Sequence, residues 1–421
     1  MENEKDKIRI KHPELWIVLF VIAVATASVS FAFACHNYAN EDPGLYLIDP
    51  IADEEVLFYG NDFSFYYYCD GEENVTTEKN NVRKSYSNKL KEIYAYLNED
   101  NTYASYISLA AINEKPNEEV SIGTTLYSML EKAYYYSDVK YNYSLFAGPL
   151  YEFWYHQFSY TQNYRVSNDP LNSEKSVNYL KQTADYINNK EHIDLKFLGE
   201  GKVKLTVSDD YKKYREEQAI NSPYLTFNIL KNSFILQAIS DYLTEKNIDK
   251  GFIITNDGSV VQLKNSPLQT YSLYSVTDLA LERAGDLTLK TNPSCGNVIR
   301  HFNLNNTSTP NYYYFTQDDV TYFRSLYLDI SNGLQNNFLF SSGIYRNDLN
   351  ILEAAIINNM LVPCASSEEI VAKLNSESKA NTTLIINSID NHKTFYINKV
   401  DKENVTLNDK LDYNLNIIKE D

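Results

Sequence analysis

Residues 228–263, NILKNSFILQAISDYLTEKNIDKGFIITNDGSVVQL, decide the fold class because a helix signal runs directly into a hairpin signal. Asn228–Lys246 carries apolar residues at helical spacing along one face, namely Leu230, Phe234, Ile235, Ala238, Ile239 and Tyr242. Asp257-Gly258 lies between two β-branched runs, and glycine tolerates the positive φ that a tight turn requires. The stretch therefore predicts a long helix followed at once by a β-hairpin.

Elements of both kinds flank this stretch. Further helices are predicted at Ser87–Leu97 (with Ser87 as its cap), Thr124–Tyr136, Glu174–Asn188, Asp348–Leu361 and after the capping box Ser366-x-x-Glu369. Strands are predicted at Phe63–Tyr68 and in a hairpin, Thr383–Ile386 and Thr394–Val400 around Asp390-Asn391. Because no regular βαβ rhythm is present, we expect a single α+β domain of mixed sheets flanked by helices over residues 81–421. Residues 35–80 are expected to form a linker and an N-terminal strand region.

The N-terminus carries an apolar segment, WIVLFVIAVATASVSFAFA at residues 16–34, that contains no charged residue. As a helix it reaches about 28 Å, close to the hydrocarbon thickness of a bilayer. Lys5, Lys7, Arg9 and Lys11 precede the segment, and the next basic residue is Lys79. The positive-inside rule therefore predicts a cytoplasmic tail at residues 1–15 and a membrane-associated, extracytoplasmic body.

The sequence leaves three fates open for this segment. Ala32-Phe33-Ala34 has the small-x-small form of a signal-peptidase site. Cys35 stands where a bacterial lipoprotein carries its lipid, although Ala32 replaces the usual leucine. The helix can also remain as a plain anchor.

Composition and charge exclude several classes of function. The net charge of −18 argues against nucleic acid as a partner, because a phosphate backbone would be repelled. The six histidines are scattered and there is no CxxC, HExxH, P-loop or GxSxG motif, which argues against a structural zinc site and several common catalytic sites.

Six stretches between Ser85 and Val400 carry a family resemblance through their order and spacing. They are Ser105–Ser108 with Asn113, Leu145–Trp154 (LFAGPLYEFW), Leu225–Phe234 (LTFNILKNSF), Ile254–Ser259 (ITNDGS), Ser294–Phe302 (SCGNVIRHF) and Leu326–Gly333 (LYLDISNG), with Leu349–Ala355 following. Together they resemble the FAD:protein FMN transferase family, the ApbE-type proteins.

The resemblance implies a function and a set of site residues. Members of the family transfer FMN from FAD to a serine or threonine of a partner flavoprotein, with Mg²⁺ on the pyrophosphate, and are commonly exported or membrane-tethered. The cofactor-binding positions it implies in this sequence are Asn113, Phe234, Gly258, Gly296, Asn297, Asp329 and Gly333.

The departures from the family pattern fall on the chemistry. The family's histidine is Leu326 here, its helix-start lysine is Asn232, and its metal-binding aspartate and threonine are Asn350 and Ala354. Lys231 and Asp348 are the candidate catalytic substitutes, and Asp348 and Asn350 are the candidate metal ligands. Neutral oxygens alone would hold Mg²⁺ weakly because its dehydration is costly.

Three interpretations therefore remain. The chain is an exported FMN transferase with a rearranged site, or an inactive flavin- or partner-binding protein of the same fold. The third interpretation is an unrelated exported binding lipoprotein.

Overall fold

We describe the fold from a computed structural model of the chain. The described residues are 22–31, 41–56, 62–263, 270–277, 280–288, 294–300, 312–336, 338–348, 350–376, 382–388, 393–397 and 405–417. They contain helices and antiparallel strands interspersed along the chain, which confirms the predicted α+β class.

The described part of the central sheet has nine strands in the order β1-β2-β6-β7-β10-β13-β14-β15-β17. Neighbouring strands are antiparallel, except that β15 and β17 are parallel. The bounds are β1 Gly44–Ile48, β2 Phe63–Cys69, β6 Gly251–Thr255, β7 Ser259–Gln262, β10 Cys295–Arg300, β13 Leu339–Arg346, β14 Thr382–Ser388, β15 Thr394–Ile397 and β17 Asn414–Ile417.

The predicted hairpin at Asp257-Gly258 is confirmed as β6–β7. Gly258 has φ +98°, and a Cβ atom there would lie 2.5 Å from the carbonyl oxygen of Val298. Both the turn and the close approach of β10 therefore require glycine at this position. The β14–β15 pairing is confirmed as well, while its turn at Asp390-Asn391 and residues 398–400 lie outside the described residues.

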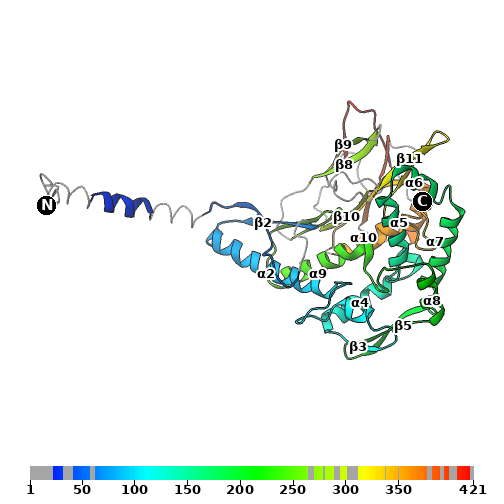
Figure 1. Cartoon of the computed structure of the whole chain (residues 1–421). Helices are drawn as coiled ribbons and strands as arrows, with labels where there is room; N and C mark the ends of the chain where they lie inside the picture. Colours follow the sequence, from blue (N-terminus) through cyan, green and yellow to red (C-terminus); the bar gives the residue numbers. More distant parts are fainter. Residues whose placement is uncertain are drawn as a thin grey trace, which may run out of the picture.

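Three helices pack with this sheet, namely α2 (Val75–Tyr96), α9 (Lys231–Glu245) and α10 (Ile351–Met360). In Figure 1, α2 and α9 run side by side, and α10 lies against β10 and β13. Every residue of α10 is buried, as its nearly continuous apolar sequence predicts. The helix predicted at Asn228–Lys246 is a 3₁₀ turn, η3 (Asn228–Leu230), that leads directly into α9.

A smaller sheet, β3-β5-β4, is visible beside α4 and α8 in Figure 1. Its strands are β3 Glu119–Ser121, β4 Ile193–Gly199 and β5 Lys202–Val207. The other helices are α3 Leu109–Asn113, α4 Thr124–Tyr136, η2 Val139–Tyr141, α5 Gly148–Ser159, α6 Gln162–Asn168, α7 Glu174–Ile187, α8 Asp209–Glu217 and α11 Ser367–Ser376. Two further pairings are β11 (Tyr313–Gln317) with β12 (Val320–Arg324), and β16 (Val405–Leu407) with β9 (Ala280–Thr288) and β8 (Thr270–Thr277).

The predicted helix bounds hold well except at two helix starts, one of which is that of α10, which begins at Ile351 rather than at Asp348. The helix at Thr124–Tyr136 has the predicted bounds, and α7 ends one residue before the prediction. The start at Ser87 was wrong: α2 begins twelve residues earlier, where the Asn74 side chain accepts a hydrogen bond from the backbone N–H of Thr77. Ser87 lies inside the helix and donates to the Arg83 carbonyl.

Part of the predicted membrane segment is described. Residues 22–31 are helical and exposed, while residues 1–21 and 32–40, including the candidate lipidation site Cys35, lie outside the described residues. Among the described helices, none combines the length and the apolar character that crossing a bilayer demands.

Candidate functional site

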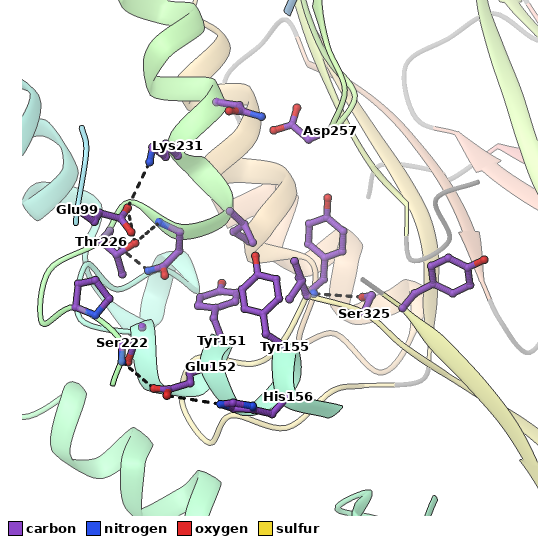
Figure 2. A pocket seen from close by; sticks show the side chains of 18 of the residues that line it. Glu99, Tyr151, Glu152, Tyr155, His156, Ser222, Thr226, Lys231, Asp257 and Ser325 are labelled. Atoms are coloured by element: carbon purple, nitrogen blue, oxygen red, sulfur yellow. Dashed lines mark hydrogen bonds and ion pairs between the residues drawn. The ribbon is translucent and has the colours of Figure 1, made fainter. Parts of the chain in front are cut away.

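A cavity of about 880 Å³ opens beside α5 and the start of α9. Six parts of the chain line it: residue 99 after α2, α5 itself, residues 221–232, the β6–β7 turn, residue 312 before β11, and residues 325–327 after β12. Figure 2 shows Tyr151 and Tyr155 projecting from α5 into this space, with Glu99 and Lys231 to one side. The cavity has the size of a small-molecule or cofactor site.

The start of α5 shapes one wall. Pro149 stands in the first turn of the helix, where its missing N–H costs nothing. A Cβ atom on Gly148 would lie 2.8 Å from the carbonyl oxygen of Pro223, so glycine is needed for the loop at residues 222–223 to approach the helix. The Gly148-Pro149 pair thus positions the loop that faces Tyr151 and Tyr155.

The opposite wall is the segment that leads into α9. Asn113 holds its start, because its side chain donates to the Leu225 carbonyl at 3.0 Å and accepts from the Leu225 N–H at 2.9 Å. Asn228 then adopts a positive φ of 49°, a conformation that asparagine tolerates and that glycine takes most readily. In the family resemblance, Asn228 stands where members carry one of two adjacent glycines. An asparagine therefore adopts the left-handed backbone conformation here that glycine adopts most readily.

Lys231 lies in the cavity and faces a carboxylate. Its Nζ is 3.8 Å from Oε1 of Glu99, and the same oxygen accepts a hydrogen bond from the Thr226 hydroxyl at 2.7 Å. Burial raises the pKa of Glu99, although Lys231 opposes this shift. The lysine is therefore positioned by a partner that neutralises much of its charge.

A second carboxyl group stands at the β6–β7 turn. Asp257 accepts hydrogen bonds from the Thr255 hydroxyl and, at 3.3 Å, from the Ser259 N–H. Burial raises the pKa of Asp257, and the hydrogen bonds from Thr255 and Asn232 oppose the shift. Sequence reasoning took this residue only as part of a turn, since its place in the cavity depends on contacts with α9.

The residue at the family's histidine position, Leu326, also lines the cavity. Its side chain is apolar and can neither accept nor donate a proton. Asn232, at the family's lysine position, donates to the Asn256 side chain at 3.3 Å. The two positions at which the resemblance implies a histidine and a lysine therefore line the cavity and carry no ionisable group.

The region around the start of α10 does not fit Mg²⁺. The Asn350 side chain caps the helix by accepting from the Glu353 N–H and donates to the Glu353 carboxylate, both at 3.1 Å. Ala354 is fully buried and has no ligand atom. Among the residues that the structure describes, no group of three or more His, Cys, Asp or Glu side chains is arranged to hold a metal.

The positive charge in this region belongs to a side chain, Arg346. The buried guanidinium of Arg346 binds Asp348 through two hydrogen bonds of 2.7 and 2.5 Å and lies 3.2 Å from the Glu353 carboxylate. The guanidinium holds the pKa of Asp348 below its usual value. Both nearby carboxylates are thus committed to an arginine, which leaves little negative charge to attract a divalent ion.

This arrangement predicts that Mg²⁺ does not bind the ligand-free chain. Adding millimolar Mg²⁺ should leave Tm unchanged, because only a bound ion stabilises the folded state by mass action. An ion present at a hundred times its Kd would add about 2.7 kcal/mol, enough for a shift of several degrees. Thermal unfolding with matched ionic strength from Na⁺ is the measurement, and an EDTA-reversible rise in Tm would contradict it.

The other predicted cofactor-binding residues lie in the framework around the site. Phe234 packs on Phe227 inside the core, and Gly296 lies in β10 where a Cβ would meet the Tyr345 ring at 2.6 Å. Asn297 is buried, donates to the Ser259 hydroxyl and accepts from Asn358. Lys231, predicted as a catalytic residue, lines the cavity, whereas Phe234, Gly296 and Asn297, predicted to bind the cofactor, do not.

The remaining two predicted cofactor-binding residues, Asp329 and Gly333, shape the loop that follows Leu326. Asp329 accepts from the Ser331 N–H at 2.9 Å and from the Asn332 side chain at 2.8 Å, which is a local turn. Gly333 has φ +73°, and its carbonyl accepts a hydrogen bond from the Trp154 indole. Gly333 thus ties this loop to α5 and Asp329 holds its turn, and a direct contact with a ligand stays a prediction for each.

Comparisons with known proteins place the fold. No family model and no curated protein sequence matches the chain. Among solved structures, the ApbE protein of Thermotoga maritima matches with a TM-score of 0.54 and 13% identity, covering 82% of this chain and 95% of its own. The flavin transferase ApbE of Vibrio cholerae matches with a TM-score of 0.53 and 9% identity, covering 87% and 97%. The chain therefore has the fold of the ApbE-type flavin transferases, as the six motif stretches predict.

Proposed function

We propose that this chain is a divergent member of the FAD:protein FMN transferase family that binds a flavin in the cavity between α5 and α9. Three observations support the proposal: the shared fold, the order of the motif stretches, and the cavity where four of those stretches meet. Tyr151 and Tyr155 provide aromatic surface for the isoalloxazine ring, and Asn228, Asn256 and Ser325 provide neutral hydrogen-bonding groups.

We propose further that the chain binds flavin without transferring FMN by the family's route. One observation carries this proposal: the positions that should supply a proton acceptor and a metal ligand hold Leu326 and Ala354, and Arg346 occupies the carboxylates near α10. Transfer of FMN would break the pyrophosphate bond of FAD and release AMP, and without a metal the charge that develops on this leaving group would lose a large electrostatic stabilisation. A partner protein on this interpretation is bound rather than flavinylated.

Equilibrium dialysis tests the binding half of the proposal. The detergent-solubilised full chain, dialysed against riboflavin in one experiment and FAD in another, should concentrate at least one of them on the protein side with saturable binding. Free tryptophan, an aromatic solute of different shape, is the control for non-specific adsorption. Equal concentrations of each flavin on both sides would overturn the proposal.

We also propose that the body lies outside the cytoplasm and is attached to the membrane through residues 16–34 or through a lipid on Cys35. The supporting observation is the asymmetry of basic residues near the apolar segment: Lys5, Lys7, Arg9 and Lys11 precede it, whereas the next basic residue after it is Lys79. Protease added to intact spheroplasts should digest the body, and full protection would overturn the topology. Release of the body by Cys35→Ala would identify the lipid as the attachment.

A further inference from the structure

The charges that line the cavity are mainly negative. Among its described lining residues are three carboxyl groups, Glu99, Glu152 and Asp257, against one lysine, Lys231, and one histidine, His156. Lys231 is already paired with Glu99, and the Glu152 carboxylate lies 3.7 Å from His156. With all three carboxylates ionised and the histidine neutral, these side chains carry a net charge of −2.

The start of α9 offers no vacant place for a phosphate. Asp257 contacts Asn232 in the first turn of that helix, so a carboxylate already lies where the helix dipole favours an anion. The guanidinium of Arg346 is bonded to Asp348 and Glu353 and is not among the lining residues. Among the described lining residues, Lys231 and His156 each face a carboxylate, so a bound pyrophosphate would meet a lining whose net charge is negative.

Neutral polar groups line the same space. The hydroxyl oxygen of Ser222 is buried from solvent and has no hydrogen-bond partner in the protein, which is a costly state unless a ligand supplies one. Thr226 and Asn228 also line the cavity, and the rings of Tyr151 and Tyr155 project between Thr226 and Ser325 (Figure 2). Such a lining suits a planar, uncharged ring with a polyhydroxyl chain.

We infer that the cavity takes riboflavin, the flavin without phosphate, in preference to FMN and FAD. This inference rests on the proposed flavin-binding function and names the substrate class of that site. The isoalloxazine ring is neutral and carries donors and acceptors along one edge, while a ribityl hydroxyl can supply the partner that the Ser222 hydroxyl lacks. Each added phosphate brings negative charge beside Glu99, Glu152 or Asp257, and like charges in a partly desolvated site repel strongly.

The test is a comparison of three dissociation constants on the full chain. Riboflavin, FMN and FAD are titrated separately at neutral pH and low salt with EDTA, and flavin fluorescence reports binding. The expected order of affinity is riboflavin, then FMN, then FAD, with the FAD constant larger than the riboflavin constant by about tenfold or more. Glu99→Gln should lower the ratio of the FAD constant to the riboflavin constant by about tenfold, because it frees Lys231 from its carboxylate.

Two further variants keep the test decisive. Glu152→Gln removes a second lining carboxylate and should also lower the ratio, which covers the case in which Glu99→Gln does not fold. Glu131→Gln removes the same charge from the exposed face of α4 and should leave the ratio as in the wild type. FAD binding as tightly as riboflavin, or more tightly, would overturn this inference and leave the flavin-binding proposal standing. Failure of all three flavins to bind would overturn the flavin-binding proposal itself.

Discussion

Incubation of the purified chain with FAD, Mg²⁺ and an acceptor protein bearing the family's serine or threonine target is expected to leave the acceptor without covalent flavin. The reason is the loss of two catalytic contributions at once: Leu326 cannot accept the hydroxyl proton, and Ala354 cannot hold a metal. Losing about 4 kcal/mol of transition-state stabilisation lowers a rate roughly a thousandfold. In-gel flavin fluorescence of the acceptor is the measurement.

The same assay identifies substitutes if they exist. An acceptor whose target residue is changed to alanine provides the background. Fluorescence on the unmodified acceptor that disappears in Lys231→Ala or Asp348→Ala would show the chain to be an active transferase and would name the residue responsible. The structure weighs against both substitutes, because Lys231 is paired with Glu99 and Asp348 with Arg346.

The largest expected effect on stability comes from Asp169→Ala. Asp169 is fully buried and accepts two hydrogen bonds from the Arg324 guanidinium, at 2.7 and 3.0 Å, and one from the Tyr313 hydroxyl at 2.6 Å. These contacts join the β11–β12 hairpin to the loop after α6. Removing the carboxylate leaves a buried arginine unpaired, which should cost about 3–5 kcal/mol.

Chemical denaturation of the body measures this loss. Glu217→Ala is the matched control, because it breaks the exposed pair with Lys213 and should change the free energy of unfolding by no more than about 0.5 kcal/mol. Equal stability of Asp169→Ala and wild type would contradict the buried ion pair. Because residues 325–327 follow directly on β12, the variant should also weaken flavin binding.

Local patterns account for the parts of the fold that the sequence predicted. The helix α4 and the β6–β7 hairpin follow from apolar spacing and from one Asp-Gly turn, which act over a few residues. The start of α2 was missed because Val75–Tyr86 is rich in polar residues and Asn74 was not recognised as a helix cap. The pairing of β2 with β6 joins segments far apart in the chain and has no local signal.

The same difference between local sequence patterns and contacts made by distant segments applies to the residues of the candidate site. The resemblance located Lys231 and Leu326 because they lie within recognisable stretches. Glu99 carries no motif, and its role depends on contacts with Thr226 and Lys231 that only the folded chain creates. Arg346 was missed for the same reason, since its charge matters only once α10 brings Glu353 beside it.

The most direct test of the central claim, that the tyrosine-lined cavity binds flavin, is a fluorescence-quenching titration of riboflavin with two tyrosine variants. Tyr155→Ala removes a ring that projects into the cavity (Figure 2), whereas Tyr135→Ala removes an exposed ring on α4 that does not line it. Loss of one stacked ring should weaken binding by about 1 kcal/mol, roughly five- to tenfold in Kd. The account predicts this loss for Tyr155→Ala alone; equal affinity of both variants and the wild type would contradict it.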